Sequence, residues 1–337
     1  MKKKVLSILL SAAMVAAMVS GCGSKDEGSS SADSADKTEA SSDDAAASDA
    51  TYEGTIKIGV VGPFSGSSAM VGDTEKKGVE LAAKQINENG GINGMTIELI
   101  EEDDQQDPKT AVSAINKLVS SDEVVAAVGT VNSSCTLAMM DVTENNEIPL
   151  VTPISSGVAI TDPSNSYIVR LQASDKLQAK AITEYAINDL GYKNIAVMFQ
   201  NDDFGAGGKD VVVETLKDAG IEPLAVEAFD SSATDMSAQL LKIKDLNPEA
   251  IIMWTMYGCG ATIAKQCDQL GIDCDLMGGG GLTNAKLYEL GGESAVGILN
   301  TQTFFPDKEK ASETAGAFID AYETEYGETP DSNAAMS

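Results

Sequence analysis

The sequence predicts an α/β protein in which parallel strands are covered by helices on both faces. The chain has 337 residues, of which 43% are hydrophobic, so it is long and apolar enough to form a sizeable core. Short apolar runs typical of buried strands alternate with stretches whose apolar residues recur at helical spacing. This alternation indicates parallel sheets, because each return to a parallel strand needs a crossover connection, usually a helix.

The first half of the body alternates strand and helix in a βαβαβ rhythm. One helix is indicated by Val79, Ala82, Ala83 and Ile86, which share one helical face. The expected elements are, in chain order, a strand at 56–61, a loop at 62–68, a helix ended by Gly90-Gly91, a strand at 95–100, a helix beginning at Pro108 and a strand at 124–128.

The second half continues the same rhythm. The expected elements are, in chain order, a helix at 137–145, a strand at 150–152, a helix at 176–190, a strand at 195–199, a helix at 211–219, a strand at 224–229, a helix at 236–246, a strand at 251–254 and a helix at 261–270. Sites in such sheets lie beyond the carboxyl ends of the strands. The loops in which we expect a site are 62–68, 129–136, 152–157, 200–207, 255–260 and 278–283.

Residues 1–22 have the pattern of a secretory signal peptide. Three lysines at 2–4 precede an apolar run at 5–19, which is too short to span a membrane and ends in small residues before Cys22. This ending resembles the bacterial lipobox, which implies lipid on Cys22 and an anchor at the outer face of the cytoplasmic membrane. The alternative is a plain signal peptide with an incidental cysteine. Residues 23–54 are rich in Ser, Ala and Asp, so we expect a disordered acidic tether.

Composition excludes several classes of function. The chain has 23 Lys+Arg against 52 Asp+Glu and a formal charge of −29, so nucleic acid is not an expected partner. It contains no histidine, and therefore lacks the usual general base and the commonest zinc ligand. Arg170 is the only arginine, so any small anion must be held mainly by backbone N–H groups and hydroxyls. We predict no catalytic residue, no metal and no cofactor.

Two loops have the chemistry to bind a carboxylate. Residues 129–136 and 152–157 each leave a strand and lead toward a helix, and both are rich in hydroxyls. The N-terminus of a helix offers free N–H groups and a favourable dipole to an anion. Ser133 and Ser156 are the leading candidates, with the alternative that they simply cap surface helices.

The chain also resembles the leucine/isoleucine/valine-binding protein family over about residues 55–330. The motifs that carry the resemblance are Ile58-Gly59-Val60-Val61-Gly62-Pro63-Phe64-Ser65-Gly66, Gly72-Asp73, Asn87-Glu88-Asn89-Gly90-Gly91-Ile92-Asn93-Gly94, Asp107-Pro108, Thr152-Pro153 and Asp203-Phe204-Gly205. It implies a type I periplasmic-binding-protein fold with two doubly wound parallel-sheet lobes joined by a hinge. Lobe 1 is expected at 55–172 and 302–337, and lobe 2 at 173–301. The family pattern continues past Ser337, so we expect a truncated C-terminus.

The resemblance implies a ligand site between the lobes. It places the ligand's carboxylate at the loops of Ser133 and Ser156, and an aromatic cover at Phe204, which is otherwise an ordinary packed loop residue. Either Met256 or Tyr257 faces the cleft. The candidate ligand-binding residues are Ser133, Ser134, Ile154, Ser155, Ser156, Phe204, Met256, Tyr257 and Gly280.

Gly280 departs from the family, because relatives that bind α-amino acids commonly have a glutamate there for the ligand's ammonium. Three interpretations stay open: Asp202 or Asp203 replaces that acid, the ligand has no ammonium, or the glycines at 278–281 merely form a flexible turn. We expect a monomeric, non-enzymatic binder of a small carboxylate-bearing solute, with amino acids first among the candidates. It would deliver the solute to the permease of an ABC importer.

The alternatives are a sensory ligand-binding module, a binder of a non-amino-acid organic acid, and an enzyme with Ser133 as nucleophile. The enzyme ranks last, because such a serine would need a base and the chain has no histidine.

Four cysteines follow Cys22, namely Cys135, Cys259, Cys267 and Cys274. They are expected either to form disulfides, with Cys267 and Cys274 close enough to pair, or to stay as buried thiols.

Overall fold

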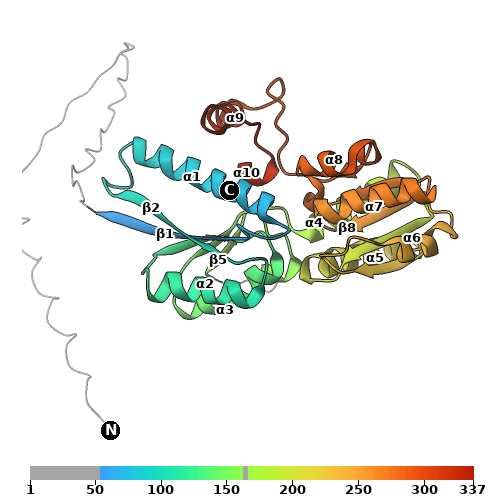
Figure 1. The fold of residues 1–337 in the computed structure, drawn as a ribbon, viewed down its shortest axis with the longest axis horizontal. Coiled ribbons are helices and arrows are strands. Elements are labelled where there is room, and N and C mark those ends of the chain that lie inside the picture. The colour runs from blue at the N-terminus through green and yellow to red at the C-terminus, as the bar shows by residue number, and fades with distance from the viewer. Residues whose placement is uncertain (1–53, 162–165) are drawn as a thin grey trace, which may run out of the picture. The chain divides into compact units, whose positions relative to one another are not determined.

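The computed structural model describes residues 54–161 and 166–337, which form two five-stranded parallel sheets flanked by helices (Figure 1). The first sheet has the order β2-β1-β3-β4-β5, with β1 (Thr55–Gly62), β2 (Thr96–Asp103), β3 (Ala126–Gly129), β4 (Leu150–Thr152) and β5 (Ile168–Arg170). The second has the order β10-β9-β8-β6-β7, with β6 (Ile195–Gln200), β7 (Val226–Phe229), β8 (Ala250–Trp254), β9 (Asp275–Gly278) and β10 (Leu299–Asn300). The predicted α/β class with two parallel sheets is confirmed.

Helices connect successive strands and cover the sheets. They are α1 (Ala69–Glu88), α2 (Pro108–Ser120), α3 (Ser133–Asn145), α4 (Asp175–Asn188), α5 (Asp203–Asp218), α6 (Ser237–Lys244), α7 (Tyr257–Leu270), α8 (Lys286–Gly291), α9 (Glu313–Tyr326) and α10 (Ser332–Met336). Short 3₁₀ turns occur at η1 (Val158–Ile160), η2 (Gly280–Leu282) and η3 (Gly292–Ala295). Pro108 occupies the first turn of α2, where its missing N–H costs no hydrogen bond, and Asp107 caps that helix through the Thr110 N–H.

Both sheets are doubly wound. In each one, the first strand along the chain lies inside the sheet: β1 between β2 and β3, and β6 between β7 and β8. The chain therefore winds first to one side of that strand and then to the other. As a result, the loops that follow β1 and β3 in the first sheet, and β6 and β8 in the second, diverge at the carboxyl ends of these strands. A crevice at this reversal of strand order is where parallel α/β sheets bind ligands.

The second sheet is buried on both faces, as its apolar strands require. Along β8, Ala250, Ile252 and Trp254 pack on the α4–α5 side, whereas Ile251 and Met253 pack on the α6–α7 side. This division follows from the alternation of side chains along a strand. All five residues have no exposed surface, so β8 is the centre of this half of the molecule.

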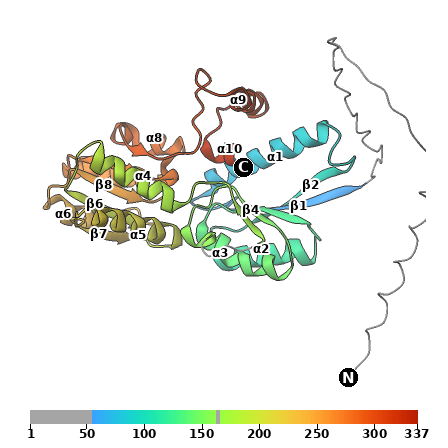
Figure 2. The ribbon, with the colours of Figure 1, turned by 180° about the vertical axis from the view of Figure 1, so that it is seen from behind.

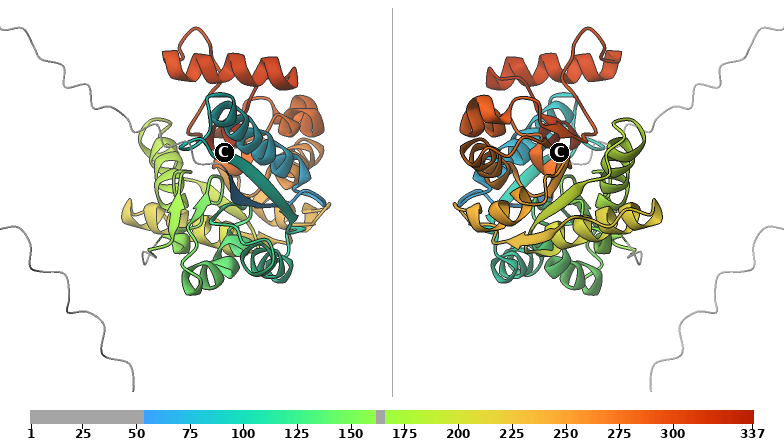
Figure 3. Two further views of the ribbon diagram at one scale, coloured as in Figure 1. Left: turned by 90° about the vertical axis from the view of Figure 1, so that its left-hand side faces the viewer. Right: turned by 90° about the vertical axis from the view of Figure 1, so that its right-hand side faces the viewer.

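After β10 the chain returns to α1, on the first sheet. Helix α10 lies beside α1 in Figures 1 and 2, and the red helix α9 lies on the outer side of α1 in the views of Figure 3. Tyr322 of α9 and Ala334 of α10 pack with Leu81 of α1, and the Tyr326 hydroxyl donates to the Lys77 carbonyl at 2.9 Å. The residues at which the chain crosses between lobes, near 172 and 301, stay a prediction.

Several helices begin earlier than their apolar periodicity indicates. Helix α3 begins at Ser133 rather than 137, α5 at Asp203 rather than 211, and α7 at Tyr257 rather than 261. The first turns of these helices are polar or glycine-rich, so their sequence lacks a helical stripe. They are helical because they follow buried strands and pack against the sheet, which overrides local propensity.

Predictions for the N-terminal part lie outside the described residues. They are the signal peptide at 1–22, lipidation of Cys22 and most of the tether at 23–54. Within 54–161 and 166–337, no helix is both long and apolar enough to cross a membrane. The four cysteines of this part are free, and burial raises the pKa of the Cys267 and Cys274 thiols to about 12, so both stay protonated at neutral pH.

The packing of Trp254 on α5 gives a testable prediction. A methyl group on Gly208 would overlap the buried Trp254 indole, whereas one on Gly207 of the same helix would meet nothing within 4 Å. We expect Gly208→Ala to lower the free energy of unfolding by about 2 kcal/mol through overpacking. Gly207→Ala, the matched control, should raise it by about 0.5 kcal/mol through helix propensity. Urea denaturation measures both, and equal effects of the two substitutions would contradict this packing.

Candidate functional site

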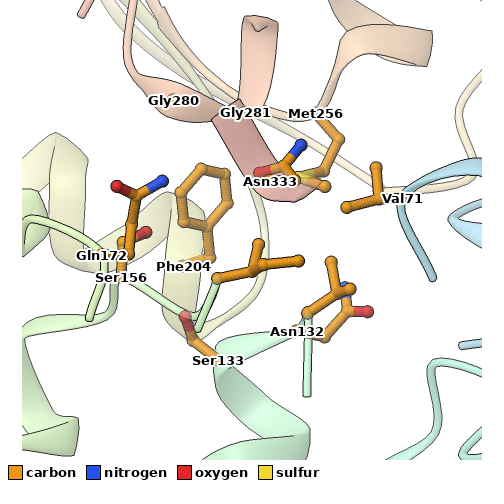
Figure 4. Close-up of a pocket in the computed structure, with 12 residues that line it drawn as sticks. Val71, Asn132, Ser133, Ser156, Gln172, Phe204, Met256, Gly280, Gly281 and Asn333 are labelled. Carbon is orange, nitrogen blue, oxygen red and sulfur yellow. The ribbon is translucent and has the colours of Figure 1, made fainter. Parts of the chain in front are cut away.

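A pocket of about 450 Å³, including the part open to solvent, lies beyond the carboxyl ends of strands from both sheets (Figure 4). Its lining residues are Val71, Val131, Asn132, Ser133, Ile154, Ser156, Gln172, Phe204, Met256, Gly280, Gly281 and Asn333. They come from the segments after β1, β3, β4, β5, β6, β8 and β9, and from α10. Each doubly wound sheet thus contributes one wall of the pocket.

The wall from the first sheet presents hydrogen-bond donors. Ser133 is the first residue of α3, and its Oγ accepts the Gly157 N–H at 3.0 Å. The hydroxyl hydrogen of Ser133 therefore remains available to an acceptor in the pocket. In the described structure the N–H groups of Ser133 and Ser134 have no acceptor, whereas those of Cys135 and Thr136 bond to the Asn132 carbonyl. These donors, together with the helix dipole, suit a carboxylate.

A buried hydroxyl network lies under this wall and fixes its two loops. The Ser155 hydroxyl donates to the Thr130 carbonyl at 2.6 Å and lies 2.7 Å from the Thr136 hydroxyl. Thr130 in turn donates to the carboxylate of Asp104. Ser155 is 1% exposed and does not line the pocket. Its side chain holds the loops after β3 and β4 together.

The wall from the second sheet is apolar and rich in glycine. The Phe204 ring lies 6.2 Å, centroid to centroid, from the buried Trp254 ring. A methyl group on Gly281 would overlap the Thr255 carbonyl and approach Phe204 to 3.2 Å, so glycine is needed where the ring lies. Met256 lines the pocket beside it. Phe204 is in the first turn of α5, not in a loop as its sequence context indicated.

Two contacts join the segments of the two sheets beside the pocket. The Tyr257 hydroxyl donates to the Ser67 carbonyl at 3.3 Å, and the Asp203 N–H donates to Ser134 Oγ at 3.4 Å. Tyr257 and Ser134 are therefore placed in this bridge rather than among the lining residues. Of the two residues expected after β8, Met256 is the one that lines the pocket.

None of the lining residues is charged, although buried carboxyl groups lie behind them. Asp175, the first residue of α4, has no exposed surface, and its N–H donates to the Ser156 carbonyl at 2.8 Å. Burial raises the pKa of its carboxyl to about 7, against smaller lowering effects of Ser156, Trp254 and Arg170. Arg170 itself donates to the Gly157 carbonyl at 2.8 Å. Within the described ranges, no group of three Cys, Asp or Glu side chains is placed to hold a metal ion.

Several lining residues were not among those predicted from the sequence. Gln172 follows β5, a three-residue strand that the apolar pattern does not reveal. Asn333 reaches the pocket from α10, which is far from the other lining residues in sequence. Three other lining residues adjoin predicted ones, namely Val131, Asn132 and Gly281. They lie in loops in which a site was expected, and this was the signal in the sequence that could have identified them.

Comparison with known proteins identifies the family. The periplasmic binding protein family matches residues 55–337. The chain is 30% identical over 260 residues to Leu/Ile/Val-binding protein homolog 3 of Brucella melitensis, covering 77% of this chain and 70% of that protein. It is 31% identical over 247 residues to the leucine-, isoleucine-, valine-, threonine-, and alanine-binding protein of Pseudomonas aeruginosa, covering 73% and 66%.

Solved structures agree with this assignment. The branched-chain amino acid transporter substrate binding protein LivJ of Streptococcus pneumoniae, in complex with isoleucine, matches with a TM-score of 0.78 and 30% identity over 84% of this chain and 80% of that one. A solute binding protein of Rhodopseudomonas palustris in complex with benzoate shares the fold, with a TM-score of 0.77 and 21% identity over 84% and 77%. The chain therefore belongs to the periplasmic binding protein family, whose members are solute-binding proteins rather than enzymes.

Asp175 makes the stability of the protein depend on pH. Its native pKa of about 7 lies above the ordinary value of 3.8, so the folded state favours the protonated carboxyl. This contribution is complete below pH 4 and is lost as the pH rises through about 7, with a total of about 4 kcal/mol. We expect Asp175→Asn to gain stability relative to the parent as the pH rises from 4 to 8.

Urea denaturation of parent and variant at pH 5 and pH 8 measures this difference. Asp189→Asn, the same change at an exposed position at the other end of α4, is the matched control and should show a nearly constant difference. A pH-independent effect of Asp175→Asn would mean that this carboxyl is ionised at both pH values.

Proposed function

We propose that this protein captures a small carboxylate-bearing solute between its lobes and delivers it to an ABC importer. The observation that carries the proposal is the wall at Ser133, where the start of α3 and the Ser133 hydroxyl line the pocket without any basic side chain. An anion is expected there because backbone N–H groups and a helix dipole can replace a cation. Family membership supports solute binding, and several structurally similar proteins are named as solute binding proteins of ABC transporters.

The remainder of the pocket favours an apolar body on the solute. Val71, Val131, Ile154, Phe204 and Met256 surround the space beyond the donor wall. Burial of a branched or aromatic carbon skeleton among them supplies affinity by the hydrophobic effect. The relatives named for leucine, isoleucine and valine make a branched-chain skeleton the first candidate.

Closure of the lobes retains the solute in this proposal. The contacts of Tyr257 with Ser67 and of Asp203 with Ser134 form only when the two walls are close together. Short connections between secondary-structure elements provide the hinge, for example residues 171–174 between β5 and α4. A bound solute shifts the equilibrium toward the closed state because it contacts both walls there.

The carboxylate wall is tested by Ser133→Ala. A screen of amino acids and organic acids by thermal shift identifies a ligand, because binding to the native state raises Tm. Ser133→Ala should then weaken binding of that ligand at least tenfold, since a hydrogen bond to a charged group is lost. Calorimetric titration measures the change.

Ser113→Ala, at an exposed position on α2, is the control and should bind as the parent does. Unchanged affinity in Ser133→Ala would place the carboxylate elsewhere.

We further propose that lipid on Cys22 anchors the mature protein at the outer face of the cytoplasmic membrane. The support is the sequence pattern at 1–22 together with the extracytoplasmic location typical of the family. Cys22→Ala should release the protein from the membrane fraction, because the remaining chain would have no acyl chain to insert. Fractionation with immunoblotting measures the distribution. Cys259→Ala, at a buried position in α7, is the control and should remain with the membrane.

A further inference from the structure

Two side-chain amides lie beside Gly280, and that of Gln172 presents a hydrogen-bond donor. The Gln172 Oε1 atom accepts the Ala173 N–H at 3.1 Å and the Thr303 hydroxyl at 2.9 Å. Because the Ala173 backbone N–H can only donate, the Gln172 atom that faces it must be the oxygen. The orientation of the amide is thereby determined, and Nε2 faces away from Ala173. Figure 4 shows that nitrogen on the side of Phe204. Among the described residues Nε2 has no acceptor, although Gln172 is only 5% exposed.

The space next to Gly280 is bounded by this donor and by the side-chain oxygen of Gln178. A Cβ atom on Gly280 would lie 3.5 Å from Gln172 Nε2 and 3.0 Å from Gln178 Oε1. That Gln178 oxygen already accepts the Gly280 N–H at 2.8 Å and the Thr301 hydroxyl at 3.1 Å. Of these two atoms beside Gly280, Gln172 Nε2 is thus the one without a hydrogen-bond partner among the described residues.

None of the residues that line the pocket is an acid that could replace the side chain that Gly280 lacks. Asp202 accepts from the Gly205 N–H and the Gln200 amide, and Asp203 is exposed outside the pocket. Asp331 accepts the Asn333 and Ala334 N–H groups and the Asn284 amide. Asp175 lies behind Ser156 and does not line the pocket.

A neutral hydrogen-bond acceptor cannot take the place of an acid as the partner of a ligand ammonium beside Gly280. Asn132 has a buried amide oxygen without a hydrogen-bond partner, but it belongs to the wall of the first sheet rather than to the corner of Gly280. An amide oxygen carries no full charge, so it compensates poorly for the desolvation of an ammonium. An ammonium beside Gln172 would also face two N–H bonds of the same polarity. An oxygen acceptor at this place would satisfy them instead.

We infer that the solute is a carboxylate whose α-substituent is a hydrogen-bond-accepting oxygen, as in a 2-oxo acid, rather than an ammonium. The inference rests on the proposed carboxylate function of the Ser133 wall. Gln172 is the specificity-determining residue, because its amide reads the α-oxygen while Gly280 leaves room for it.

Matched pairs of ligands test the inference. Calorimetric titration compares L-leucine with 4-methyl-2-oxopentanoate, L-valine with 3-methyl-2-oxobutanoate, and L-phenylalanine with phenylpyruvate, so that each pair differs only at the α-carbon. We expect at least one 2-oxo acid to bind ten times or more tighter than its amino acid. An amino acid that binds as tightly as its 2-oxo acid, or no binding by any 2-oxo acid, would overturn the inference.

Two substitutions test whether Gln172 and Gly280 determine the preference for a 2-oxo acid. Gln172→Leu should reduce affinity for the preferred 2-oxo acid at least fivefold, whereas Gln269→Leu, at an exposed position on α7, should leave it unchanged. Gly280→Glu places a carboxylate beside Gln172 and should reverse the preference toward the amino acid of the pair. Retained affinity in Gln172→Leu contradicts the role of Gln172.

Ser133→Ala separates this inference from the proposed function. If the 2-oxo acid binds equally well to Ser133→Ala, the carboxylate wall is misplaced and the proposed function fails with it. If the amino acid binds best and is weakened by Ser133→Ala, the wall stands and only the choice of α-substituent is wrong.

Discussion

The hydrogen bond from the Gly157 N–H to Ser133 Oγ joins the two loops on which the binding wall depends. A Cβ on Gly157 would come within 2.9 Å of the Ser133 Cβ, so this close approach requires glycine. The Ser155 hydroxyl reinforces the junction from below by bonding to the Thr130 carbonyl. Because the loops are held from behind, the Ser133 hydroxyl keeps a fixed position on the pocket wall. A carboxylate can then be solvated by the protein at little cost in reorganisation.

The opposite wall is shaped by steric limits rather than by hydrogen bonds. Gly208 lies against Trp254, and Trp254 packs on Phe204. A side chain on Gly281 would overlap the Thr255 carbonyl and crowd the Phe204 ring. Replacement of Gly208 would displace the Trp254 ring in a close-packed interior. The position of the ring over the pocket is thus a consequence of packing that begins on the far side of the second sheet.

Much of this arrangement could be predicted from the sequence, and the reasons differ from residue to residue. Ser133, Ile154, Ser156, Phe204 and Met256 follow strands that the apolar pattern predicts, whereas Gly280 was predicted from the family resemblance; all six line the pocket. The pattern could not separate them from Ser134, Ser155 and Tyr257, because adjacent residues share a loop but point in different directions. Gln172 follows a strand of only three residues and Asn333 depends on the packing of α10 upon α1. Such long-range contacts leave no periodicity in the local sequence.

The acidity of the chain and the affinity proposed for a carboxylate are compatible because they act over different distances. The formal charge is −29, yet none of the lining residues carries a charge. Repulsion by surface carboxylates is screened over about 8 Å at physiological ionic strength. At the pocket wall, oriented N–H and hydroxyl dipoles act at contact distance and dominate. A histidine-free chain with one arginine can therefore hold an anion, provided that its loops are fixed as those of Ser133 and Gly157 are.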